Sequence, residues 1–222
     1  MAYRRTENVM RRLNARHNAI VRAARDAAAD GGMAAIQILP VAARAGIAAG
    51  TVYRYFPGKA DLVTALIENV SERELAATRR AAGAAPGPLS ALAAAIATFA
   101  ARALRQRRLA FAMIAEPVDA EIDTARIGYR KALAGELKTL IEAAIAGGHL
   151  PEQDTAIAAP ALAGALIEGL VGPLAPEVAH DPAKAREAVQ ALTLLALRGL
   201  GVVDARARGL VVQTALPEEN ER

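Results

Sequence analysis

The stretch that decides the fold runs from Gly32 to Leu62 and reads GMAAIQILPVAARAGIAAGTVYRYFPGKADL. It predicts two short helices, near 38–45 and 49–55, joined by a tight turn at Gly46. The Phe56-Pro57-Gly58 sequence that follows would end the second helix. Two short helices joined in this way form a helix-turn-helix, whose second helix can enter the major groove of DNA.

The apolar and polar residues of this stretch fall on different sides of the predicted helices. The apolar ones are spaced to pack against an earlier helix expected from about Asn14 to Asp30, and they are Ile38, Val41, Ala42, Ala45, Ile47, Val52 and Phe56. The outward positions of the second short helix are Thr51, Tyr53, Arg54 and Tyr55, with Lys59 just beyond. Hydroxyls and cations of this kind suit phosphate oxygens and base edges, so this surface is a candidate nucleic-acid interface.

Composition favours an all-α protein around this stretch. The chain has 222 residues, which is enough for one or two domains, and its apolar fraction of 54% is dominated by alanine, the best helix former. Aromatic residues make up 3% and Trp is absent, which argues against a β-sandwich or propeller. There is no Cys, which excludes disulfides and cysteine-ligated metals and fits a reducing cytoplasm. The polar, Arg-rich N-terminus does not look like a signal peptide, so we expect a cytoplasmic protein.

Charge is unevenly distributed along the chain. Residues 1–60 hold ten Lys or Arg and three Asp or Glu, whereas residues 61–222 hold seventeen basic and twenty acidic residues. This asymmetry is typical of a polyanion-binding head on a mildly acidic body. A solvated basic face would give the same pattern, and charge alone leaves both interpretations open.

Helical periodicity continues through the rest of the chain. Further helices are expected near 59–80, 89–105, 107–116, 119–146, 152–175 and 183–200, with an ambiguous tail after Val203 and disorder from Pro217 to Arg222. The Gly- and Pro-rich stretch 83–88 is the clearest linker. We therefore divide the chain into a DNA-binding domain at 1–58, a connecting helix at 59–82 and a C-terminal domain at 83–222.

One segment raises the question of a membrane span. Thr155 to Ala175 contains a single charged residue, Glu168, and its length would just cross a bilayer. Pro160 and Pro173 interrupt it, and it is rich in Ala and Gly. We favour a helix buried in a core or in a subunit interface over a membrane helix.

Catalytic and metal-binding motifs are scarce. None of the three histidines forms a zinc-binding pair, and Glu177 to His180 gives one isolated Glu-x-x-His where a di-iron bundle needs two. There is no phosphate-binding P-loop and no nucleophile elbow. We therefore expect no metal, no cofactor and no enzyme, with a helical-bundle enzyme kept as the weaker alternative.

The matching pattern of Gly32, Ile38, Val41-Ala42, Ala45-Gly46-Ile47, Gly50 to Pro57 and Lys59 resembles the TetR family of bacterial transcriptional regulators. The resemblance covers about residues 14–66, and beyond them only helix number and length agree. It implies a nine-helix homodimer with a three-helix DNA-binding domain and a C-terminal domain for a ligand and for dimerisation. By position, it brings Gly50, Thr51 and Tyr53 near bases and Arg54, Tyr55 and Lys59 near phosphates of a palindromic double-stranded operator.

The sequence departs from the family at the start of the second short helix. Ala48 stands where the family often has Ser, and losing a Ser N-cap costs about 1 kcal/mol. Gln37 replaces the usual Ser or Thr, and we keep it among the DNA contacts. We expect basic residues at the N-terminus to compensate by reaching phosphate or the minor groove, the alternative being a disordered tail; these are Arg4, Arg5, Arg11, Arg12 and Arg16.

The C-terminal domain should hold the remaining sites. Candidate ligand-binding residues, which could equally be core residues, are Phe99, Phe111, Met113, Glu116 and Tyr129. The dimer interface would use the helices at 152–175 and 183–200, through Ala161, Gly164, Ala165, Glu168, Leu192 and Leu195. The carboxylates of Glu116 and Glu168 stand in apolar surroundings, so each needs a ligand or an interhelical bond. We expect a repressor released by a small, mostly apolar effector; an effector-independent architectural DNA-binding protein is the alternative.

Overall fold

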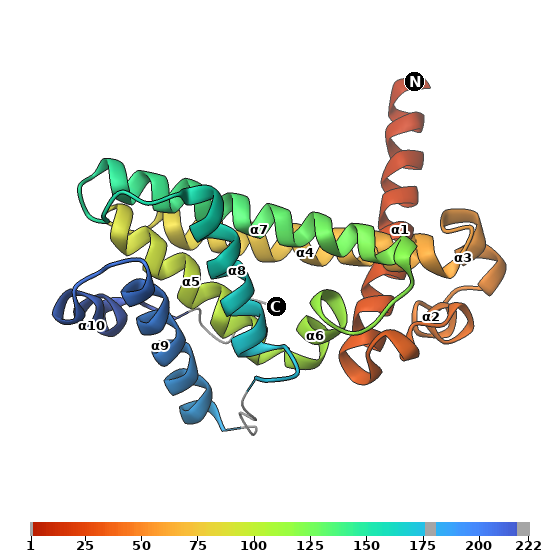
Figure 1. Ribbon diagram of the computed structural model, residues 1–222. Helices are drawn as coiled ribbons and strands as arrows, with labels where there is room; N and C mark the ends of the chain where they lie inside the picture. The colour runs from red at the N-terminus through yellow and green to blue at the C-terminus, as the bar shows by residue number, and fades with distance from the viewer. Residues whose placement is uncertain (1, 176–180, 217–222) are drawn as a thin grey trace.

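The computed structural model describes residues 2–175 and 181–216, and over these residues it is helical without strands. Ten α-helices and one short 3₁₀ helix follow one another (Figure 1). Their bounds are α1 Ala2–Gly31, η1 Met33–Ala35, α2 Ile38–Arg44, α3 Ala49–Tyr55, α4 Lys59–Gly83, α5 Pro88–Arg105, α6 Arg107–Ile114, α7 Ala120–Ala146, α8 Thr155–Leu170, α9 Pro182–Gly199 and α10 Asp204–Gln213. The all-α prediction is confirmed.

The first three α-helices form a compact head. Val41, Val52 and Phe56 are buried against α1, and the other predicted packing residues are buried or partly buried beside them. Gly46 connects α2 to α3 with φ of +68°, a backbone conformation that glycine adopts without strain. The helix at 49–55 has the bounds expected from the sequence, because a glycine turn precedes it and a proline follows it.

The remaining helices form the body. The two longest, α4 and α7, lie side by side along it, and α5 packs closely against α4 (Figure 1). α8 packs on α7, and α9 packs on α5. The short α6 contacts α1, α5 and α7, so it lies where the head meets the body.

The structure differs from the sequence predictions mainly at the helix ends. α1 begins at Ala2 rather than near Asn14, because residues 2–13 contain no Gly or Pro and continue the helix beyond the head (Figure 1). The ambiguous tail contains α10, which packs on α9 and makes ten α-helices where nine were expected. The segment 217–222, where disorder was predicted, lies outside the described residues.

The apolar segment at 155–175 forms a shorter helix than expected. α8 ends at Leu170, because the backbone turns before Pro173. Within the described ranges, no helix combines the length and the hydropathy needed to cross a membrane.

Gly32 provides a test of how the head is joined to the body. Its φ is +71°, and an added Cβ would overlap the Arg108 guanidinium and the Glu116 carboxylate. We predict that Gly32→Ala lowers the free energy of unfolding by about 2–4 kcal/mol. Backbone strain would add to the loss of two hydrogen bonds, from Arg108 to the Gly31 carbonyl and from the Met33 N–H to Glu116. Urea denaturation at fixed protein concentration measures this.

Gly46→Ala is the matched control, because Gly46 has the same φ region and no atom within 4 Å of an added Cβ. Its loss should be limited to the backbone term of about 1–2 kcal/mol. Equal losses in the two variants would contradict the close approach at Gly32.

Candidate DNA-binding surface and ligand pocket

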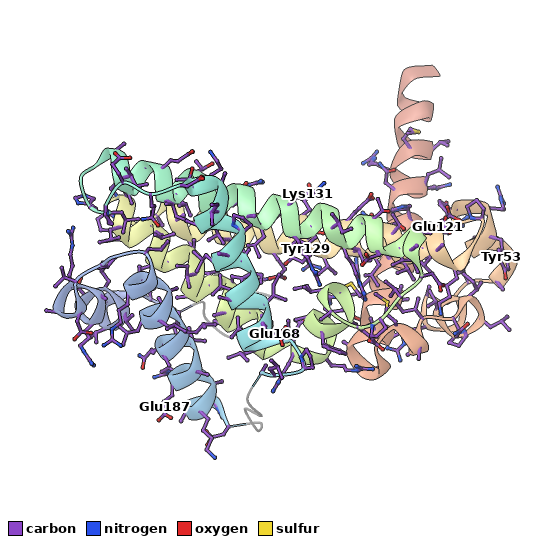
Figure 2. All side chains as sticks on the ribbon, viewed as in Figure 1. Tyr53, Glu121, Tyr129, Lys131, Glu168 and Glu187 are labelled. Atoms are coloured by element: carbon purple, nitrogen blue, oxygen red, sulfur yellow. The ribbon has the colours of Figure 1, made fainter. Side chains whose placement is uncertain are left out.

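α3 presents the exposed surface of the head. Tyr53 is 53% exposed and points away from the body, and Gly50 and Arg54 are also exposed (Figure 2). Thr51 and Tyr55 are half-buried, so each offers a hydroxyl at the edge of this surface. Gly50, Tyr53 and Arg54 therefore share one exposed face of a seven-residue helix, with Thr51 and Tyr55 at its edges.

His17 of α1 packs against the C-terminal end of α3. Its ring lies 5.0 Å from the Phe56 ring and 6.5 Å from the Tyr55 ring, the latter edge-to-face. Aromatic contacts of this geometry restrict ring orientation. The contact was not foreseen, since the sequence gives His17 no visible partner.

Further polar and basic residues are exposed on the elements next to α3, namely before α2, at the start of α4 and on α1. Lys59 is exposed at the first position of α4, where backbone N–H groups favour an anion, although the Asp61 carboxylate accepts the Gly58 N–H at 2.8 Å. Gln37 is exposed before α2. Arg11, Arg12 and Arg16 are exposed along α1, and Arg4 and Arg5 lie in its first turns, in the part that extends away from the molecule (Figure 1).

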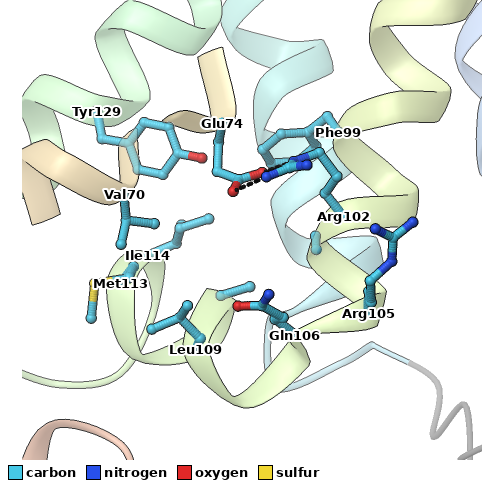
Figure 3. Close-up of a pocket in the computed structure, with 12 residues that line it drawn as sticks. Val70, Glu74, Phe99, Arg102, Arg105, Gln106, Leu109, Met113, Ile114 and Tyr129 are labelled. Atoms are coloured by element: carbon cyan, nitrogen blue, oxygen red, sulfur yellow. Dashed lines mark hydrogen bonds and ion pairs between the residues drawn. The ribbon is translucent and has the colours of Figure 1, made fainter. Parts of the chain in front are cut away.

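A cavity lies inside the body, between α4, α5, α6 and α7. Its volume is about 500 Å³ including the part open to solvent. Its lining residues are Val70, Glu74, Phe99, Arg102, Ala103, Arg105, Gln106, Leu109, Ala110, Met113, Ile114 and Tyr129 (Figure 3). Three predicted ligand residues, Phe99, Met113 and Tyr129, are therefore in its wall.

The wall of the cavity holds an ion pair between Arg102 and Glu74, and Arg105 and Gln106 also line it. Arg102 donates from Nε and Nη2 to the two carboxylate oxygens of Glu74, at 2.5 and 2.9 Å (Figure 3). Both side chains are mostly buried, and a bidentate pair of this kind is strong and directional. Beside it, burial raises the pKa of Tyr129, and the negative charge of Glu74 adds to this shift, so the phenol stays protonated at neutral pH.

The other two predicted ligand residues are elsewhere. Phe111 and Glu116 do not line the cavity. The Glu116 carboxylate instead accepts the backbone N–H of Met33 at 3.1 Å, and it lies 3.5 Å from Arg108, which donates to the Gly31 carbonyl at 3.0 Å. Glu116 therefore makes the interhelical bond that was one of its two expected uses, and it ties the end of α6 to the head.

Two arginines of α7 hold the C-terminal end of α6. Arg126 is buried and donates to the carbonyls of Ala112 and Glu116, and Arg130 donates to the Ile114 carbonyl at 2.6 Å. Burial lowers the pKa of Arg126, with Asp123 and Glu116 opposing this shift, but a guanidinium stays charged in proteins. Last-turn carbonyls of a helix lack intrahelical donors, and these cations supply them.

These arginines and the Glu74–Arg102 pair were missed by the sequence analysis. A signal existed for Arg126, since it stands between Ile122 and Tyr129 on the apolar face of its helix, where a charge needs a partner. No comparable signal links Glu74 with Arg102, because the two residues lie on different helices and are 28 positions apart in the sequence.

The exposed side of α8 carries most of the predicted dimer residues. Ala161, Gly164 and Ala165 are exposed, and α9 adds Leu195 with 62% of its surface accessible. Leu192 turns inward and lies against Gly169 of α8. Glu168 was expected in apolar surroundings but is exposed, and its carboxylate accepts the Leu174 N–H at 3.2 Å (Figure 2).

The described residues give little support for a catalytic or metal-binding site. Over residues 2–175 and 181–216, no three His, Asp or Glu side chains come together as metal ligands would. The isolated motif from Glu177 to His180 lies outside the described residues. Glu74 and Tyr129 both line the cavity, but Glu74 is engaged by Arg102, and the pKa of Tyr129 moves away from neutrality.

Comparison with known proteins identifies the head. The family described as bacterial regulatory proteins, tetR family, matches residues 20–66, which run from the buried part of α1 into α4. The head of the chain is that of the tetR family. The transcriptional repressor KstR of Mycolicibacterium smegmatis is 45% identical over 65 residues, which are 29% of this chain and 32% of KstR. The match to that relative thus spans about a third of its length.

Solved structures show that the tetR-type fold extends over the body. A complex of RolR with resorcinol has a TM-score of 0.68 at 20% identity and covers 94% of this chain and 98% of RolR. The fatty acid degradation regulator FadR of Bacillus halodurans has a TM-score of 0.72 at 22% identity, covering 85% and 97%. FadR of Bacillus subtilis, in complex with stearoyl-CoA, gives 0.67 at 20% identity, covering 79% and 96%. At these identities the likeness is one of fold.

The Glu74–Arg102 pair gives a stability test of the cavity wall. We predict that Arg102→Met lowers the free energy of unfolding by about 1.5–3 kcal/mol, because it leaves a mostly buried carboxylate without its cation. Arg79→Met is the matched control, since its pair with Glu136 joins α4 to α7 at the surface and should contribute less than about 1 kcal/mol. Chemical denaturation measures both, and an equal loss in the two variants would contradict the buried character of the pair.

Proposed function

We propose that this tetR-family chain is a homodimeric transcriptional repressor that a small, mostly apolar effector releases from a palindromic operator. The observation that carries the proposal is the exposed face of α3, with Gly50, Tyr53 and Arg54 on a head that matches the tetR family over residues 20–66. The KstR repressor is 45% identical to this chain over 65 residues. A recognition helix with exposed hydroxyls and cations is suited to the major groove.

In this proposal, the residues of the head divide between bases and phosphates. Gly50, Thr51 and Tyr53 approach base edges, with Gly50 allowing close approach of the backbone. Phosphates are contacted by Arg54, Tyr55 and Lys59, with Gln37 at the edge. The basic part of α1 that extends beyond the head reaches neighbouring phosphates or the minor groove through Arg4, Arg5, Arg11 and Arg12.

The first test is binding to DNA taken from immediately upstream of the protein's own gene, by fluorescence anisotropy with scrambled competitor DNA. We expect specific binding that weakens steeply as salt is raised. Lys59→Ala should weaken binding to all sequences alike and reduce the salt slope by about one, because one phosphate contact is lost. Lys131→Ala on α7 is the matched control and should leave both unchanged.

Two outcomes of this experiment would contradict the proposal in different ways. Salt-sensitive binding without sequence preference would favour the architectural alternative. Absence of binding at low salt would overturn the assignment to DNA. The partly apolar cavity in the body supports a ligand-responsive regulator over a fully packed architectural protein.

Dimerisation is proposed to use the exposed sides of α8 and α9. The small residues Ala161, Gly164 and Ala165 lie three and four positions apart, so they form a stripe on α8 that allows a second helix to approach closely. Leu195 of α9 continues the apolar surface, and Ile157, 66% exposed, extends it on α8. Two copies related by a two-fold axis would bury these stripes in a four-helix bundle.

Leu195→Glu tests this interface. We predict that it converts the dimer to monomer at micromolar concentration, because two carboxylates would be buried near the axis without partners. Sedimentation velocity measures the change. Ile127→Glu, at an exposed apolar position of α7, is the matched control and should remain dimeric. The proposal fails if Leu195→Glu is as dimeric as the wild type.

Regulation would pass from the cavity to the head through two helices. α4 begins at the head and lines the cavity with Val70 and Glu74. α6 gives a shorter route, since Leu109 and Met113 line the cavity while Glu116, just after the helix, binds Met33. An effector acts only through its different affinity for the two states, typically 1–3 kcal/mol.

A further inference from the structure

The hydroxyl of Tyr129 has no hydrogen-bond partner among the residues that the structure describes, although the side chain is only 4% exposed. Tyr129 lines the cavity, and Figure 3 shows its hydroxyl directed toward the side where Glu74 lies. A phenol in a mostly buried side chain normally finds a partner, and the Tyr129 oxygen is not among the fully buried polar atoms, so a molecule in the cavity can bond to it. An unpaired one in a cavity wall therefore marks a place for a polar atom of a ligand.

The Glu74–Arg102 pair defines what that polar atom can be. Arg102 donates one hydrogen bond to each carboxylate oxygen of Glu74, and each oxygen keeps a further lone pair. The two charges cancel, so this part of the wall is polar without an excess of either sign. A ligand group placed beside Tyr129 therefore meets a neutral phenol and a carboxylate whose charge is balanced.

Three common ligand groups meet this corner differently. An ionised carboxylate can accept from Tyr129 but has no proton to donate to Glu74. An ammonium can donate to Glu74 but cannot accept from the phenol. A neutral hydroxyl accepts from Tyr129 and donates to Glu74 at the same time, and it leaves the ion pair intact.

The side chains beside Tyr129 indicate the polarity of the remainder of the ligand. Near this corner the cavity is lined by apolar side chains from α4, α5 and α6, namely Val70, Phe99, Leu109, Met113 and Ile114. We propose that the pocket selects a neutral, mostly apolar molecule with an alcohol or phenol group, bound through the Tyr129 hydroxyl and the Glu74 carboxylate. This inference rests on the proposed function only in taking the cavity as the effector site.

The test compares four probes of nearly equal shape: 2-naphthol, 2-methylnaphthalene, 2-naphthoate and 2-naphthylmethylammonium. Isothermal titration calorimetry with the full-length protein at neutral pH measures their affinities. We expect 2-naphthol to bind at least tenfold more tightly than each of the other three. A site built to hydrogen-bond a hydroxyl discriminates strongly against an analogue without it.

Two variants assign the preference to Tyr129. Tyr129→Phe should reduce the advantage of 2-naphthol over 2-methylnaphthalene to less than about threefold while leaving 2-methylnaphthalene affinity nearly unchanged, because the ring is kept. Tyr55→Phe makes the same chemical change in the head, away from the cavity, and should keep the full preference. Circular dichroism confirms that both variants are folded.

Every other result overturns the inference. These results are tightest binding of the carboxylate or the ammonium probe, equal binding of 2-naphthol and 2-methylnaphthalene, a preference that survives Tyr129→Phe, and no binding of any probe at millimolar concentration. DNA plays no part in this experiment. Selective binding of 2-naphthol by a protein that fails to recognise an operator would leave the pocket assignment standing and remove only the proposed function.

Discussion

The hydrogen bonds from Arg126 to the carbonyls at the C-terminal end of α6 are the interaction on which the cavity wall and the contact with the head depend. α6 has only eight residues, too few to be stable by itself, and its last turn is fixed by cations from α7. Fixing that turn also places Glu116, which reaches the Met33 N–H of the head. Arg126 therefore supports both the part of the cavity wall that α6 supplies and the junction with the head.

This dependence gives the cavity and the head a shared element. The face of α6 toward the body contributes Leu109 and Met113 to the cavity, and the chain just after it binds the head. Gly32 completes the junction, because its missing side chain leaves room for the Arg108 and Glu116 side chains. A molecule that shifts α6 within the cavity would therefore act on the backbone immediately before the helix-turn-helix.

The sequence predicted those parts whose causes are local. Helix α3 was predicted residue for residue, since Gly46 and Pro57 bound it, and its exposed face followed from the spacing of Val52 and Phe56. The start of α1 and the existence of α10 were missed, because no cap or periodic apolar face distinguishes them from a tail. Glu74 with Arg102, and Glu116 with Met33, depend on tertiary packing over 28 and 83 positions, so no spacing rule could reveal them.

Hydrogen exchange at the Met33 amide tests the central claim most directly. Arg126 touches α6 and not the head, yet Arg126→Met should speed exchange at Met33 by at least tenfold, because Glu116 loses its fixed position. Amides of α3 should be unchanged, and Arg126→Lys, which can still donate one bond, should give an intermediate rate. An unchanged Met33 rate in Arg126→Met, with faster exchange confined to α6 and α7, would contradict the account.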